Sequence, residues 1–173
     1  MTNTVTDNTV VPIQRNRFSG LTFADINSAE ADKLVLLALE ILSAKHQPGT
    51  TLSEPSLTER YLQLQWAGRT AEVFGCIFLD TKLRAISFEE MFHGTIDSTQ
   101  VYPRVVVQRA LAVNAFSVIF AHNHPSGDEE PSCADISLTK RLKEALALVD
   151  IQVLDHIVVG VKGVTSFAKR GLI

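Results

Sequence analysis

Two histidines and an aspartate are the residues of this chain whose types and spacing best suit chemistry. His122 and His124 flank Asn123, and Asp135 follows in the string HNHPSGDEEPSCAD. Two imidazoles and a carboxylate supply three ligands to a tetrahedral zinc ion and leave its fourth position open for water. An open position distinguishes a catalytic zinc site from a structural one. The string therefore predicts a catalytic centre with one zinc ion per chain.

Each part of this string also has an ordinary structural explanation. Ser132 and Asp135 have the spacing of a capping box, which satisfies the first N–H groups of a helix. The segments Pro-Ser-Gly and Asp-Glu-Glu-Pro are common in loops, and an HxH pair can occur in a strand without a metal. We favour the metal site because all the parts occur together at compatible spacing, and Ser132 can serve both purposes.

The hydrophobic pattern places the three candidate ligands on rigid elements. Residues 116–121 (FSVIFA) form a short apolar run that predicts a buried strand ending at His122. Side chains alternate along a strand, so His122 and His124 should leave the same face. Ser132 opens an amphipathic helix, which puts Asp135 in its first turn. A strand end and a helix start can thus face one cavity.

The remaining segments alternate between helical and strand-like patterns. Helices are predicted from Asn27, with Glu30 as its capping partner, to Pro48-Gly49, from Pro55 and from Pro103. Strands are predicted at residues 71–79, 83–88, 151–154, 156–161 and 164–167. Interleaved strands and helices predict an α/β or α+β sandwich.

Length and composition indicate one globular domain with a small extension. The chain has 173 residues, of which 46% are hydrophobic and 20% charged. We predict a flexible tail over residues 1–20, a helical extension over residues 21–50 and the main domain over residues 51–173. The string LVLLALEIL in the extension has more apolar surface than one helix face needs, which indicates a homodimer or a packed extension.

Charge, hydropathy and cysteine content indicate which class of partner and which cellular compartment suit this chain. The net charge of −3 gives no support to a nucleic-acid surface, and the cluster Lys140, Arg141 and Lys143 is better explained as a solvated helix face. No apolar run has membrane-spanning length, and no signal peptide is recognised. Cys76, within an apolar run, is predicted to be a core residue, and the two cysteines suit a reducing, bacterial-type cytoplasm.

The string resembles a known signature. HxH, seven residues, Ser, two residues and Asp is similar to the JAMM (MPN+) metalloprotease motif, and the longer string resembles the RadC-like branch. Further matches are LDTK, GTIDS, YPR and LDHIVVG, so the resemblance covers residues 53–173. It implies a JAMM/MPN-like (cytidine-deaminase-like) fold, in which helices flank a central mixed sheet and the zinc lies at the sheet edge.

The resemblance also implies a glutamate that activates the zinc-bound water, at the start of an upstream strand. Glu72 occupies that position, and it is the only carboxylate that begins the first buried strand. Glu89 and Glu90, at the end of the predicted hairpin partner, are the alternatives. Glu72 would pass a proton to the leaving amine, and Ser132 would donate to the oxyanion.

The other candidates carry weaker predictions. Cys133 is an alternative ligand, although its side chain should diverge from that of Asp135 by about 200° on a helix. Asp155 and His156 should point to opposite faces of a strand, so His156 is a core residue or a support behind the metal. The remaining three are His46 as a loop residue, His93 as a structural residue, and Arg104 as either an anion-binding residue or a salt-bridge partner.

These observations predict a zinc metallopeptidase or isopeptidase that acts on a peptide or protein substrate. The alternative is a metal-containing, non-peptidase module associated with DNA metabolism or repair. Zinc deaminases carry a Pro-Cys-x-x-Cys ligand pair, and no CxxC occurs here, which disfavours that third class.

Overall fold

The structure is a computed structural model that describes residues 22–45, 52, 55–95 and 99–173. The tail predicted over residues 1–20, the helix stop at Pro48-Gly49 and His46 lie outside these residues. No helix in the described ranges is both long and apolar enough to cross a membrane.

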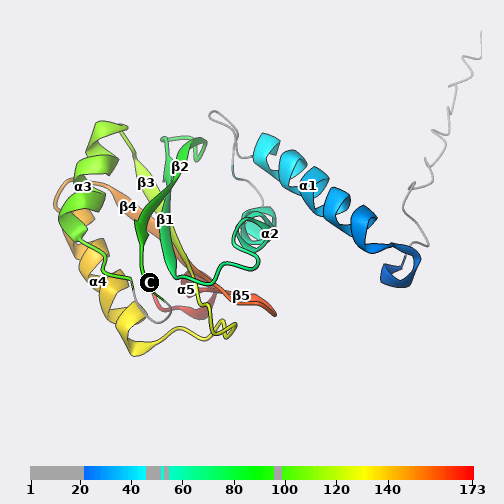
Figure 1. Ribbon diagram of the computed structural model, residues 1–173. Coiled ribbons are helices and arrows are strands. Elements are labelled where there is room, and N and C mark those ends of the chain that lie inside the picture. Colours follow the sequence, from blue (N-terminus) through cyan, green and yellow to red (C-terminus); the bar gives the residue numbers. More distant parts are fainter. Residues whose placement is uncertain (1–21, 46–51, 53–54, 96–98) are drawn as a thin grey trace, which may run out of the picture. The chain divides into compact units, whose positions relative to one another are not determined.

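Five strands form one mixed sheet, in the order β2-β1-β3-β4-β5 (Figure 1). They are β1 (Val73–Leu79), β2 (Ala85–His93), β3 (Ser117–Asn123), β4 (Gln152–Val159) and β5 (Val164–Ser166). β3 and β4 are parallel, and the other neighbours are antiparallel. The predicted mixed sheet flanked by helices is therefore confirmed.

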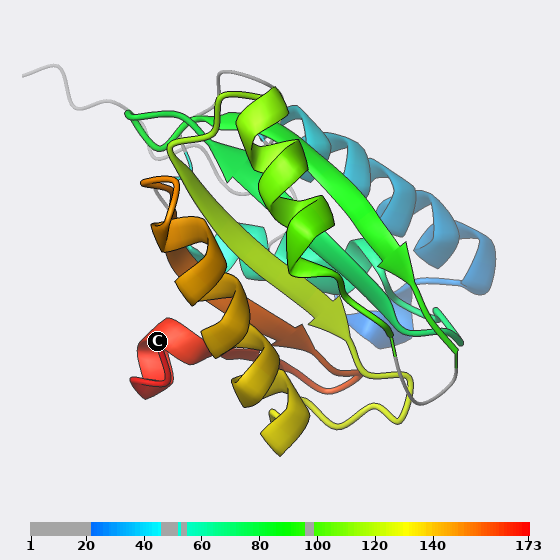
Figure 2. The same cartoon turned by 90° about the vertical axis from the view of Figure 1, so that its left-hand side faces the viewer.

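Helices cover both faces of this sheet (Figures 1 and 2). On one face, α3 (Pro103–Ala112) and α4 (Cys133–Ala147) bury apolar residues against Phe74, Phe78 and Phe120. On the other face, α2 (Pro55–Gln65) packs Leu62 and neighbouring side chains against β1, β3 and β4. The short helix α5 (Phe167–Arg170) follows β5. Cys76 is buried in the core, as predicted.

The N-terminal part contains a short 3₁₀ helix, η1 (Phe23–Asp25), and the helix α1 (Ser28–Lys45). Asn27 and Glu30 form the predicted capping box: each side chain accepts a hydrogen bond from the other residue's backbone N–H, at 3.0 and 3.1 Å. Two acceptors thus satisfy otherwise unpaired N–H groups at this helix start.

β4 is one strand with a bulge, where two strands separated at residue 155 were predicted. Val118 pairs with Val153, but the next residue of β3, Ile119, pairs with Asp155, so β4 holds one extra residue. Val153 and Phe120 share the core under α3 and α4, whereas Leu154 packs with Ile119 in a cluster on the other face. The extra residue changes which side chains of β4 point to each face of the sheet. His156 therefore lies beside Phe120, on the α4 face.

The boundaries of three other strands also differ from those predicted. β1 begins at Val73, so Glu72 immediately precedes it. β2 continues to His93, which places Glu89 and Glu90 inside this strand and corrects their predicted place at its end. β3 continues through Asn123, because its pairing with β4 continues to that residue.

Candidate metal centre

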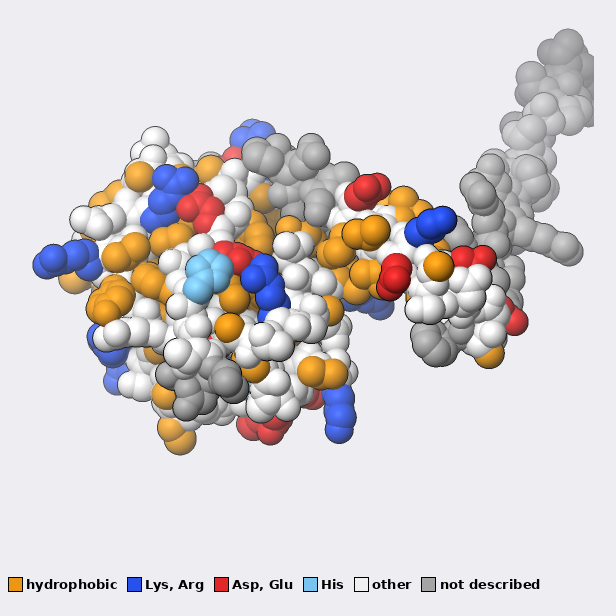
Figure 3. Space-filling model, viewed as in Figure 1, with side chains coloured by type: hydrophobic (Ala, Val, Ile, Leu, Met, Phe, Trp, Pro, Cys, Tyr) orange, Lys and Arg blue, Asp and Glu red, His pale blue; other side chains and the backbone are white. Residues whose placement is uncertain are grey.

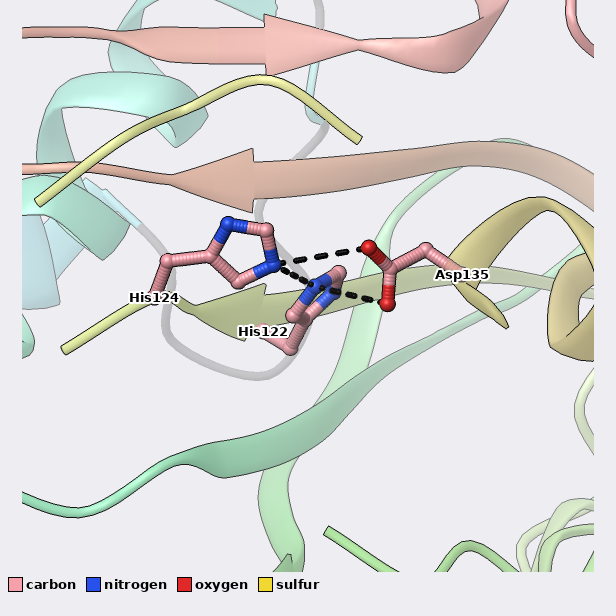
Figure 4. A group of neighbouring side chains, drawn as sticks. All are labelled: His122, His124 and Asp135. Atoms are coloured by element: carbon pink, nitrogen blue, oxygen red, sulfur yellow. Dashed lines mark hydrogen bonds and ion pairs between the residues drawn. The ribbon is translucent and has the colours of Figure 1, made fainter. Parts of the chain in front are cut away.

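His122, His124 and Asp135 converge at the end of β3 and the first turn of α4 (Figure 4). One ligand atom from each residue lies within 4.8 Å of the others. The two Nε2 atoms are 2.9 Å apart, and Asp135 Oδ1 lies 3.3 Å from His122 Nε2. Asp135 Oδ2 lies 3.4 Å from His124 Nε2. A tetrahedral zinc site with bonds of 2.0–2.1 Å has ligand atoms roughly 3.3 Å apart, so these spacings suit one ion.

The hydrogen bond behind His124 determines which of its ring nitrogens is free. His124 Nδ1 lies 2.8 Å from the carbonyl oxygen of Asp128, in the loop between β3 and α4. A carbonyl oxygen only accepts hydrogen bonds, so Nδ1 carries the proton. In the neutral ring, Nε2 therefore presents a lone pair toward His122 and Asp135, as a metal ligand requires.

The charges around Asp135 favour a cation between these groups. Burial alone would raise the pKa of Asp135, but hydrogen bonds with His122 and His124 lower it well below its usual range. The hydrogen bond with Asp135 raises the pKa of His124. An ionised carboxylate beside two imidazole nitrogens attracts either a proton or a metal ion. The donor set fits a divalent metal with nitrogen and oxygen ligands.

Glu72 lies beside this group. Phe74 pairs with His122 across β1 and β3, and Glu72, two residues earlier, is expected to leave the same face of the sheet. Its backbone is fixed by two hydrogen bonds, from Glu72 N to Thr95 O at 2.9 Å and from Gly94 N to Glu72 O at 2.8 Å. Burial raises the pKa of the Glu72 carboxyl, and the charges of His122 and His124 oppose that rise.

Glu72, His124 and Asp135 line one cleft of about 860 Å³. Its walls come from the segment before β1, the start of α3, the loop after β3 and the first turns of α4. The polar residues in its lining include Glu72, Thr99, His124, Ser132, Asp135 and Arg141. A second cleft of about 710 Å³ lies toward α2, and His124 and Pro125 contribute to both clefts.

Sequence comparison places the domain in a family. The model for the RadC-like JAB domain matches residues 52–172, which is most of the chain. The chain belongs to the RadC-like JAB domain family. The resemblance expected from the histidine string is therefore confirmed, and the metal-site geometry occurs within the matched segment.

Several proteins named only as UPF0758 proteins are similar to this RadC-like JAB domain chain. The Vibrio cholerae protein is 54% identical over 134 residues, which cover 78% of this chain and 84% of that protein. The Janthinobacterium protein is 52% identical over 83% of this chain and 64% of its own length. The Nitrosococcus oceani protein is 58% identical over 72% of this chain and 56% of its own length. The chain thus spans less than two thirds of the last two.

Ser132 has both a capping contact and a contact with a candidate ligand in this RadC-like JAB domain. It is the N-cap of α4, and its Oγ accepts a hydrogen bond from Asp135 N at 3.1 Å. The hydroxyl donates to Asp135 Oδ2 at 2.6 Å, and Ser132 N donates to the same oxygen at 2.7 Å. The capping box thus holds a candidate metal ligand, and Ser132 lines the cleft.

The other predicted residues lie outside the group of three ligands. Cys133 is exposed on α4 and is absent from the group of mutually close ligand atoms. His93 is exposed at the end of β2, 3.8 Å from Glu90. Arg104 is exposed in the first turn of α3. Asp155 accepts hydrogen bonds from Ser166 Oγ and two backbone N–H groups, not from the His156 ring.

Basic side chains do not gather into a continuous band on the face of the RadC-like JAB domain shown in Figure 3. Lys140, Arg141 and Lys143 are exposed on α4, as expected for a solvated helix face.

Glu89 and Glu90 are each paired with a cation: Arg109 bonds Glu89 at 2.6 Å, and Arg69 bonds Glu90 at 3.0 Å.

Two supporting side chains were not predicted from the sequence. Asn123 Oδ1 accepts a hydrogen bond from Val73 N at 2.7 Å, and Asn123 Nδ2 donates to Ala71 O at 3.1 Å. Thr139 contacts both the backbone of Asp135 and the ring of His156. Only the positions of these two residues in the sequence pointed to a supporting role. Asn123 alternates with the two histidines along the strand, and Thr139 follows Asp135 by one helical turn.

Proposed function

We propose that this domain is a zinc-dependent hydrolase that cleaves amide bonds, as a metallopeptidase or isopeptidase of JAMM type. The observation that carries the proposal is that Glu72 shares one cleft with His124 and Asp135, whose ligand atoms lie close to that of His122. A metal site alone predicts binding. A carboxylate beside it, whose pKa is raised by burial, adds a group able to accept and return a proton.

His122, His124 and Asp135 would hold the zinc ion. Zinc bound there would polarise the amide carbonyl and lower the pKa of a coordinated water to about 7. Glu72 would accept the proton of that water and then deliver it to the departing amine. The partly buried position of Glu72 suits this role, because burial brings the pKa of a carboxyl closer to the working pH.

Ser132 has two roles in this proposal. Its hydroxyl donates to Asp135 Oδ2, which orients the carboxylate that would bind zinc. The same hydroxyl lines the cleft, and rotation about its C–O bond would turn its proton from Asp135 toward an oxyanion on the substrate. Removal of one such donor typically lowers the rate by about 10²–10³-fold.

The two clefts support a polypeptide substrate. They meet at His124 and Pro125, so substrate chain could extend away from the metal site on either side. The two clefts, of about 860 and 710 Å³, together offer more room than a single small metabolite fills.

A cleavage screen tests the proposal. The zinc-loaded full chain is incubated with a peptide library and with isopeptide-linked substrates, and products are identified by mass spectrometry. Glu72→Gln keeps the shape of the side chain but removes the base, so it should retain zinc and lose cleavage by at least about 100-fold.

The matched control is Glu89→Gln, which alters a carboxylate paired with Arg109. This variant should cleave at nearly the wild-type rate. Equal cleavage by the Glu72→Gln variant and the wild type would remove Glu72 as the base. Zinc bound equally by His122→Ala would remove the ligand assignment.

A further inference from the structure

A buried chain of hydrogen bonds runs from the candidate ligand His122 to the backbone of α4. His122 Nδ1 lies 2.8 Å from His156 Nε2. His156 Nδ1 lies 2.6 Å from Thr139 Oγ1, and that hydroxyl donates to Asp135 O at 2.6 Å. The chain therefore starts at one metal-ligand residue and returns to the backbone of another.

The proton positions follow from the acceptor at the end of the chain. Asp135 O can only accept, so Thr139 gives its single hydroxyl proton to it. The Thr139 oxygen then has only lone pairs left for His156, whose Nδ1 must carry a proton. A neutral His156 has a lone pair on Nε2, which accepts the Nδ1 proton of His122. His122 Nε2 is left with a lone pair directed toward His124 and Asp135.

The surroundings of His156 keep its ring neutral and hold its plane. The side chain is fully buried, and the rings of Phe74, Phe120 and Phe167 pack around it with centroid distances of 5.6, 5.8 and 4.8 Å. A charged imidazole in such an apolar site would be costly without a carboxylate partner. A protonated His156 would also donate from Nε2 and force the proton of His122 onto its ligand nitrogen.

We propose that His156 and Thr139 are positioning residues, which set the orientation and the tautomer of His122 so that its Nε2 atom can bind the metal. The direction of the chain is fixed near its end, where the Thr139 hydroxyl has one proton and gives it to Asp135 O. The inference rests on the metal-binding part of the proposed function and not on the peptidase activity. Supports of this kind typically change metal affinity by about 10- to 100-fold.

Zinc affinity of the full chain, measured by competition with a chromophoric chelator, tests the proposal. Thr139→Val keeps the shape of the side chain but removes the acceptor of the His156 proton, so affinity should fall by about tenfold or more. Thr139→Ser restores the hydroxyl and should recover affinity near that of the wild type. Thr58→Val, which removes a buried hydroxyl from α2 on the other face of the sheet, should leave affinity unchanged.

Nitrogen-15 NMR of the histidine side chains tests the same proposal without any variant. In the zinc-loaded wild type, His156 should carry its proton on Nδ1 and none on Nε2. A His156 proton on Nε2, or unchanged zinc affinity in folded Thr139→Val, would overturn the inference. A wild type that binds no zinc would remove this inference together with the proposed function, whereas zinc binding without cleavage would remove only the peptidase activity.

Discussion

The side chain of Asn123 holds the backbone on both sides of Glu72. Its oxygen accepts a hydrogen bond from the N–H of Val73, and its nitrogen donates to the carbonyl of Ala71. The residue between the two candidate metal-ligand histidines thus links β3 to the segment that carries the proposed base. Both bonds are partly or fully buried, so this carboxamide, together with the hydrogen bonds of Glu72 to Thr95 and Gly94, helps to fix the position of Glu72 relative to the histidines.

Asn123→Asp tests this link. The aspartate keeps the acceptor for Val73 but places an oxygen opposite the carbonyl of Ala71, where the donor was. We expect a loss of about 1–3 kcal/mol in the free energy of unfolding, because a buried acceptor loses its partner. If Glu72 is the base, the rate of cleavage should fall while zinc content stays the same. Denaturant unfolding, zinc analysis and cleavage rates check this, and unchanged stability would contradict it.

A comparison of Ser132→Gly with Ser132→Ala separates the helix-capping role of Ser132 from the role of its hydroxyl in the cleft. Glycine is a tolerable N-cap, so α4 should lose only a few tenths of a kcal/mol, compared with about 1 kcal/mol for Ser132→Ala. Both variants lack the hydroxyl that bonds Asp135 and lines the cleft. Cleavage should therefore drop by a similar factor, about 10²–10³, in both. If the rate of cleavage in the two variants followed the stability of α4 instead of the loss of the hydroxyl, this would argue against the proposed oxyanion contact.

Zinc stabilisation should depend on pH through His124, whose pKa is raised by Asp135. In the metal-free protein, the protonated ring stabilises the fold fully below the ordinary histidine value of about 6.5. This contribution is lost as the pH rises through the raised pKa. Zinc needs the unprotonated ring, so its stabilisation grows over the same pH range. The difference in Tm between zinc-loaded and chelator-treated samples should increase with pH. A difference that does not change with pH would contradict competition between zinc and a proton at His124.

Gly160→Ala should disturb His124 from the opposite side of the loop. An added Cβ would lie 2.7 Å from Gly127 O and 2.8 Å from Glu129 N, so the backbone that presents Asp128 O to His124 must shift. We expect a loss of about 1–3 kcal/mol in stability from this overpacking and a weaker affinity for zinc.

Gly163→Ala is the matched control for Gly160→Ala. Its added Cβ would meet the side chain of Glu129, at 3.1 Å from Oε1, and that flexible side chain can move away. Stability and zinc affinity should stay near those of the wild type in this variant. Similar losses in both variants would show that the loop backbone is not the sensitive part.

Much of the candidate site follows from local rules. Alternation along β3 predicts that His122 and His124 share a face, and the capping box places Asp135 in the first turn of α4. Glu72 was recognisable as a carboxylate at the start of a buried strand. These predictions rest on neighbours in sequence, where the geometry of one strand or one helix decides the outcome.

The supports of the site could not be predicted in the same way. Asn123 bonds residues 50 and 52 positions away, so its partners depend on how β1 pairs with β3. Thr139 appears in the sequence as one more residue of an amphipathic helix, and only the packing of α4 over β4 reveals its contact with His156. The string LDHIVVG carries no sign of the bulge, because an extra residue depends on the register between two strands.

The bulge in β4 makes the candidate metal centre sensitive to strand register as well as to residue type. Side chains alternate between faces along a regular strand, so Val153 and His156, three positions apart, both face α4 only because Leu154 is an extra residue. A slip of one residue that paired Leu154 with Ile119 would direct Asp155 toward His122 in place of His156, and it would exchange a neutral acceptor for an anion without altering any ligand. Removal of Leu154 would leave Asp155 and His156 paired as they are, so this stretch of chain should tolerate a shortening at that position better than an insertion before His156.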